Sequence, residues 1–299
     1  MLGLIFAFTA GAVTLALLLA WAGRTPGAGE LGRWAARYEL DLRREDRPWV
    51  ARELRRGRLL RTLGFTAVFG IGMGANIWWG AVHQVSTAPF PLNLLIHPAA
   101  WATGYLVGAT VAELTRRGRD RQPVRAAALV PRRLGDYLPG WMLWVERGVA
   151  LAVLALSPLP HLSPPDDPSG PGHGFMAGVA AIAIAAAVEL ALRSMVVRRQ
   201  PVATPAELAV DDAMRSTSIH RTAGAGLAAL LFLLGEQAGG LPPRVWLLSS
   251  VVGLLCYGLA IGAWKDLTVP LRWRIRRAYG SGGSGQAPLP RHDPGRGPA

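Results

Sequence analysis

The stretch GFMAGVAAIAIAAAVELALR, residues 174–193, decides the fold class of this chain, because it is almost entirely apolar over 20 residues. A helix rises about 1.5 Å per residue, so a stretch of this length crosses a hydrocarbon core of about 30 Å. A backbone in lipid has to satisfy its own hydrogen bonds, which a helix does. The stretch therefore predicts a transmembrane α-helix.

Apolar blocks of the same length recur along the chain, which is 51% hydrophobic and only 17% charged. Soluble domains carry about 25% charged residues. The sequence thus predicts an all-α, polytopic transmembrane bundle that forms one domain over residues 1–279. Residues 280–299 are rich in Gly, Ser and Pro and are expected to form a disordered cytoplasmic tail. The seven expected spans are residues 2–22, 65–86, 94–114, 141–158, 174–193, 222–240 and 245–264.

The distribution of basic residues predicts the orientation. Of the 32 basic residues, 30 fall on one side of this seven-span arrangement, and Arg147 lies within a span. Basic residues are disfavoured on the translocated side, so the N-terminus is expected outside and the C-terminus in the cytoplasm. We expect the first span to be retained, because residues 1–3 contain no Lys or Arg and the segment after the span is densely basic. The net charge of +13 then reflects basic loops beside anionic lipid, and nucleic-acid binding is not expected.

Two cytoplasmic segments, residues 30–61 and 268–279, combine arginines with tryptophans. In the first, apolar residues recur at helical spacing, and a helix is expected to restart near Asp46 and run on into the second span. Such helices commonly lie in the membrane interface, although a docking surface for a cytoplasmic protein is the alternative. The expected interface residues are Trp34, Trp49, Trp273 and Arg274.

Ionisable residues inside spans cost about 2.5–3.5 kcal/mol each, so four of them stand out. Helical spacing allows Glu113 to pair with Arg116 or Arg117, and Glu189 to pair with Arg193. Arg147 needs a partner of its own, for which Glu113 and Glu189 are both candidates. Structural ion pairs and a substrate or proton pathway are the two interpretations left open. The candidate intramembrane cluster is Glu113, Glu146, Arg147 and Glu189.

Histidines on the predicted outer side are weak metal or pH-sensing candidates, because their spacing matches no metal signature. They are His83, His97, His161 and His173. No cofactor is expected, and phosphate-loop, nucleophile-elbow, Cys-x-x-Cys and dinucleotide fingerprints are missing from the sequence. The single cysteine, Cys256, lies in an apolar block, so it forms no intrachain disulfide.

Short repeated motifs raise the question of internal duplication. VAEL at 111–114 is followed by RQPV at 121–124, and AVEL at 187–190 is followed by RQPV at 199–202. Parallel hairpin repeats and chance in a biased composition both account for this. Glycine pairs four residues apart permit close helix packing in three spans. They are Gly70 with Gly74, Gly104 with Gly108, and Gly258 with Gly262.

The segments VPRRLGDYLP (130–139) and VDDAMRSTSIH (210–220) resemble segments of uncharacterised multi-pass membrane proteins of actinobacteria. The resemblance covers about residues 94–265 and implies the same membrane location, but no activity. The leading functional hypothesis is a non-enzymatic accessory, permease-like or regulatory component of the cell membrane. The alternatives are a stand-alone transporter that uses the polar cluster on spans three to five and, less favoured, an intramembrane enzyme.

Overall fold

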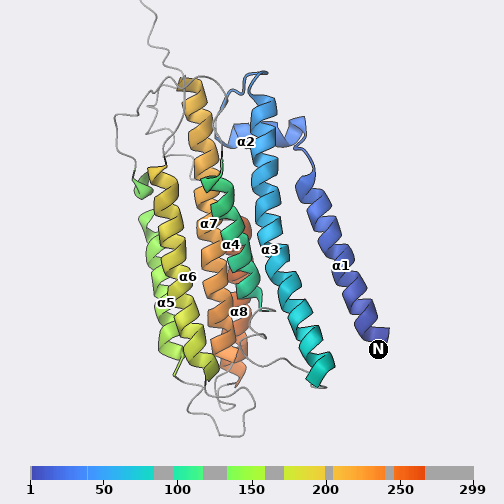
Figure 1. The fold of residues 1–299 in the computed structure, drawn as a ribbon. Helices are drawn as coiled ribbons and strands as arrows, with labels where there is room; N and C mark the ends of the chain where they lie inside the picture. Colours follow the sequence, from blue (N-terminus) through green and yellow to red (C-terminus); the bar gives the residue numbers. More distant parts are fainter. Residues whose placement is uncertain are drawn as a thin grey trace, which may run out of the picture.

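In the computed structural model, the described residues are 2–38, 40–83, 97–116, 133–158, 172–198, 205–239 and 246–266. These residues form eight α-helices, one 3₁₀ turn (Leu134–Asp136) and no strand, which confirms the all-α prediction (Figure 1). The interfacial candidates Trp273 and Arg274 and the C-terminal tail lie outside the described ranges. The helices are α1 (Leu2–Gly23), α2 (Ala28–Arg37), α3 (Arg47–His83), α4 (Pro98–Leu114), α5 (Gly140–Leu156), α6 (Gly172–Val197), α7 (Pro205–Gly239) and α8 (Trp246–Asp266).

Three helices are long and apolar enough to cross a membrane, judged by length and composition. They comprise α3 and the segments Phe175–Val197 of α6 and Leu208–Ala238 of α7. Large apolar side chains also cover the outer faces of the peripheral helices, where Leu190 of α6 and Leu254 of α8 are 71% and 74% exposed. Water-soluble proteins rarely expose apolar surface so extensively, which suggests that this is a membrane protein.

Helix α7 is the centre of the bundle. In its most apolar 18-residue window, 83% of the residues are buried, compared with 11% for α3. Helices α4, α5, α6 and α8 all pack against α7, whereas α3 packs against α4, and α1 packs against α3 (Figure 1). The chain therefore surrounds one buried helix with more exposed ones, and α1 and α3 form an outlying pair.

The crossing of α3 and α4 depends on glycines. A Cβ atom at Gly104 would overlap the backbone oxygen of Gly64, and one at Gly108 would overlap that of Leu60. Only glycine permits this approach, so this predicted glycine pair is a packing surface. The other two predicted pairs differ, because a Cβ at Gly70, Gly74, Gly258 or Gly262 meets no atom within 4 Å.

Helices α3 and α7 extend far beyond the apolar blocks. Helix α3 begins at Arg47 and continues through the apolar block, as the sequence predicts. Helix α7 is much longer than the predicted span of residues 222–240. It runs without a break from Pro205 over 35 residues, or about 50 Å. Its polar first half stays helical because its side chains bond to other helices, as described below.

The prediction that Trp34 lies in the membrane interface was wrong. Leu31, Trp34, Tyr38 and Leu42 do share one face, but that face is buried against α3 and against Val210, Ala213 and Met214 of α7. Trp49 packs at the edge of the same cluster. An amphipathic pattern identifies a helix face that is buried, but not what buries it. In this protein α3 and α7 bury the Trp34 face, and lipid does not.

A threonine of α7 anchors this contact. The Thr217 hydroxyl donates to the Ala213 carbonyl at 2.9 Å, so it accepts from Trp34 Nε1 at 3.2 Å and from the Tyr38 hydroxyl at 2.5 Å. Burial raises the pKa of the Tyr38 phenol, which keeps it neutral and able to donate. The docking of α2 therefore has a directional component in addition to apolar burial.

We expect Thr217→Val to loosen α2, because the variant leaves two buried donors without an acceptor at a cost of about 1–3 kcal/mol. Trypsin should then cleave faster at arginines between residues 33 and 47. Thr110→Val is the matched control, since the Thr110 hydroxyl bonds to the Leu106 carbonyl of its own helix at 3.0 Å. Equal rates of cleavage of the two variants would show that the Thr217 hydrogen bonds do not contribute to the docking of α2.

Candidate functional site

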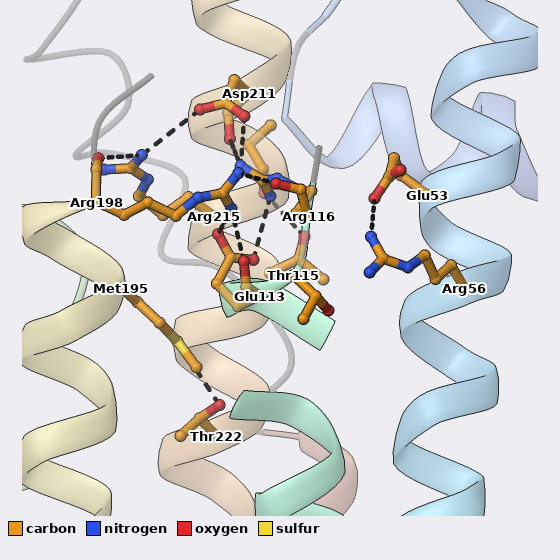
Figure 2. A network of polar contacts seen from close by, with 12 residues as sticks. Glu53, Arg56, Glu113, Thr115, Arg116, Met195, Arg198, Asp211, Arg215 and Thr222 are labelled. Carbon is orange, nitrogen blue, oxygen red and sulfur yellow. Dashed lines mark hydrogen bonds and ion pairs between the residues drawn. The ribbon is translucent and has the colours of Figure 1, made fainter. Parts of the chain in front are cut away.

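A buried network of charges joins the ends of α4 and α6 to the first half of α7 (Figure 2). At its centre is Glu113, which is 1% exposed. One Glu113 oxygen is 3.2 Å from Arg116 Nη1, and the other is 2.9 Å from Arg198 Nη1. Arg116 also pairs with Asp211 of α7. The predicted pair of Glu113 with Arg116 is thus present, as one part of a larger network.

Two arginines of the network, Arg198 and Arg215, cap the C-terminal ends of two helices. Arg198 donates to the carbonyls of Glu113 and Arg116 at 2.8 and 2.5 Å, at the end of α4. Arg215, which is fully buried, donates to the carbonyls of Val196 and Arg198 at 3.0 and 2.9 Å, at the end of α6. The last carbonyls of a helix have no partner within it and carry partial negative charge. The network has three arginines (Arg116, Arg198 and Arg215) and two acids (Glu113 and Asp211), so it carries one excess positive charge. The helix-end carbonyls offset this charge.

A tyrosine before α5 contacts the same part of α7. The Tyr137 hydroxyl donates to Asp212 Oδ1 at 3.1 Å. Asp211 and Arg215 of α7 are 3.7 Å apart. Burial, reinforced by the neighbouring Arg116, lowers the pKa of Arg198. The acids and arginines of this network bond to one another and to helix ends, although Asp211 Oδ2 and Arg215 Nε have no hydrogen-bond partner among the described residues.

A second polar group lies apart from this network, between α5 and α6. Arg147 of α5 is 2.6 Å from Glu189 Oε1 of α6, and Arg193 is 2.8 Å from the same oxygen. Of the two predicted candidates, the partner of Arg147 is therefore Glu189. Glu146, the neighbour of Arg147, points elsewhere: it is 5% exposed, and its Oε1 atom has no hydrogen-bond partner among the described residues.

A cavity of about 340 Å³ opens beside these residues and faces the outside of the bundle. Its polar members are Glu146, Arg147 and Glu189, and the rest of its lining is apolar. The apolar residues that line it are Leu143, Ala150, Leu151, Ile182, Ala185 and Ala186. A smaller crevice of about 30 Å³, enough for one or two water molecules, borders the α7 network, and its charged lining residues are Glu53, Arg61, Glu113, Arg116 and Arg221.

The predicted four-residue cluster is thus two separate sites. Glu113 belongs to the network around α7, and the other three residues line the α5–α6 cavity. Three members of the network, Arg198, Asp211 and Arg215, were missed. The spacing of Asp211 and Arg215 by one helical turn was a usable signal, but only a continuous α7 gives it meaning.

The copies of the proposed repeat also differ in environment, since Glu113 is buried among arginines and Glu189 lies on the cavity rim. The RQPV copies at 121–124 and 199–202 lie outside the described residues.

Two of the predicted histidines, His83 and His97, lie in the described part of the chain and contact neighbouring groups. His97 caps α4, accepting from the Ala99 backbone N–H at 3.2 Å through Nδ1, and its Nε2 lies 2.8 Å from Glu236 of α7. His83 stacks on Trp79 with a ring separation of 3.7 Å. Within the residues that were searched, no three potential metal ligands gather. His161 and the side chain of His173 lie outside the described part.

Comparison of the chain with protein-family models, with curated proteins and with solved structures finds no match in any of the three. The geometry of the two sites is therefore the basis for assigning function.

Proposed function

We propose that this protein is a multi-pass component of the cell membrane with seven spans, its N-terminus outside and its C-terminus in the cytoplasm. In this proposal it works without catalysis, as an accessory or permease-like subunit of a transport system or as a regulatory protein. The observation that carries the proposal is the network around α7, in which Glu113 contacts only arginines and helix-end groups among the described residues. Acids held in this way brace a scaffold and do not move a substrate.

The direction of the helices supports the topology. The beginnings of α3, α5 and α7 and the ends of α4 and α6 lie at the same end of the bundle as α2 (Figure 1). The arginine-rich segments attach at this end, and positive residues favour the cytoplasmic side. Whereas α2 has only 10 residues, the other four helices that are proposed to cross the membrane, α1, α4, α5 and α8, have 17 to 22 residues each. Helices of this length span a bilayer when they are apolar.

Anionic lipid is the proposed partner of the arginines on the outer surface of this end. Arg33 and Arg37 of α2 and Arg52 and Arg55 of α3 are exposed, whereas the tryptophan face of α2 is buried. Each arginine near an anionic leaflet gains about 1 kcal/mol. A membrane or cytoplasmic protein would use the same exposed surface, and nucleic acid is not proposed as a partner.

Cysteine labelling in intact cells tests the topology, after Cys256 has been replaced. Cysteines at Pro164 and Leu241 are expected to react with an impermeant maleimide. Cysteines at Arg121, Arg199 and Gly282 are expected to react only after the membrane is permeabilised. Labelling of position 121 or 199 from outside would overturn the orientation.

The accessory role is tested by mild solubilisation of native membranes followed by native mass analysis. We expect the full chain to migrate in an assembly with at least one other membrane protein. A monomer that by itself catalyses solute flux in reconstituted vesicles would instead establish the second candidate, a stand-alone transporter. The cavity beside Glu146 is the observation that favours this second candidate.

A further inference from the structure

The α5–α6 cavity is lined by a carboxyl group, that of Glu146, with one oxygen that has no hydrogen-bond partner among the described residues. Glu146 lies about 9 Å along α5 from its first residue, and 95% of it is shielded from solvent. A buried charge is costly unless a group of opposite charge pairs with it. The Oε1 atom has no such group among the described residues, although the cavity beside it has space for a ligand.

The two arginines that contact Glu189 at this site are already engaged. Arg147 and Arg193 both donate to Glu189 Oε1, at 2.6 and 2.8 Å. The Arg147 guanidinium also lies 5.4 Å from the centre of the Trp144 ring, where a cation is attracted to the aromatic face. These contacts direct both guanidinium groups to Glu189. The acid that faces the cavity without a cation of its own is Glu146.

We propose that this cavity binds a hydrophobic cation, with the positive group of the ligand beside Glu146 and its apolar body between α5 and α6. The apolar walls around Ala150, Ile182 and Ala185 favour an apolar body, and the carboxylate favours a positive charge. The volume of about 340 Å³ is at the lower end of the range of about 300–1,000 Å³ for small-molecule sites, which indicates a compact ligand.

The position of the cavity fits this chemistry. It opens between α5 and α6, which expose apolar residues beside it, including Leu151 and Ile182. This step rests on the proposed placement of α5 and α6 in the bilayer, since hydrophobic cations concentrate in membranes. An anionic ligand would have to approach Glu146 and to displace Glu189 from Arg147. A polar neutral solute would lose its hydration against apolar walls without replacement.

Two probes of the same shape and opposite charge test the proposal on the purified full-length protein in detergent. Tetraphenylphosphonium is the cation and tetraphenylborate is the anion. Equilibrium dialysis at pH 8 is expected to show saturable binding of the cation and none of the anion. Saturable binding of the anion with equal affinity would mean that the cavity selects apolar surface alone, which overturns the proposal.

Glu146→Gln removes the charge and keeps the shape, so it is expected to weaken cation binding at least tenfold. Glu45→Gln is the matched control, because Glu45 is an exposed acid in the segment between α2 and α3. If Glu146→Gln fails to fold, Ala185→Phe is tested in its place. This variant fills the cavity and keeps Glu146, so it is also expected to weaken cation binding. Unchanged cation binding in either folded variant would overturn the proposal. Labelling of the loop cysteines tests the membrane topology independently of these results.

Discussion

Replacing Arg215 with methionine is expected to lower the free energy of unfolding by about 3–5 kcal/mol, because it removes one partner from a buried ionic network. Arg215 is fully buried and donates to the carbonyls of Val196 and Arg198. Methionine fills similar space but satisfies neither carbonyl, and Asp211 loses one of its two arginines. The measurement is reversible unfolding by a denaturing detergent in mixed micelles, followed by circular dichroism.

Arg193→Met is the matched control for this experiment. Arg193 also belongs to an ion pair at helical spacing, with Glu189, but its side chain is 68% exposed. Exposed pairs of this kind contribute about 0.3–0.5 kcal/mol. Glu189 also keeps Arg147 as a partner when Arg193 is lost. Equal destabilisation by the two substitutions would mean that water reaches the network, and its role as a brace would be lost.

Adding one methyl group at Gly104 is expected to destabilise the protein by about 2–3 kcal/mol, because it forces α3 and α4 apart. The new carbon would overlap the Gly64 carbonyl oxygen and lie 2.7 Å from a Val68 methyl group. Backbone atoms cannot move aside by changing rotamer, so the whole crossing has to shift. Thermal unfolding in detergent measures the loss, and Gly104→Leu should enlarge it.

The sign of the effect should reverse at Gly70 of α3. A Cβ there meets no atom within 4 Å, so Gly70→Ala is expected to be neutral or to stabilise α3 by up to about 1 kcal/mol. Both variants introduce the same methyl group into a helix, and they differ in what that group contacts. Equal destabilisation by Gly70→Ala and Gly104→Ala would show that the close contact of α3 and α4 at Gly104 does not account for the effect.

Local sequence patterns predicted some helices well and others poorly. The apolar blocks at 2–22 and 245–264 agree with α1 and α8 within two residues at each end. Long apolar runs predict helices reliably because lipid leaves the backbone no alternative. The first half of α7 was missed because Asp, Ser and Thr favour turns when they are considered alone. Their bonds to Arg116, Trp34 and Tyr137 are long-range and have no local signature.

The candidate site shows the same limit. The pairing of Glu189 with Arg193 follows from one helical turn, so the sequence predicted it. The choice of Glu189 over Glu113 for Arg147 required knowing that α5 packs against α6. The sequence also could not predict that Glu146 has an oxygen without a partner among the described residues. Adjacent residues on a helix point in different directions, and the packing of the helices determines which groups each one contacts.

The sequence by itself determined that the chain is helical and rich in apolar residues, and which helical turns carry charge. These properties are local, because they depend on side-chain transfer energies and on hydrogen bonds within a helix. Only the tertiary structure decided which helix is central, what covers the Trp34 face, and which acids are paired. These outcomes depend on contacts between residues far apart in the chain, such as Trp34 with Thr217 and Glu113 with Arg198, and on packing geometry that no local pattern contains.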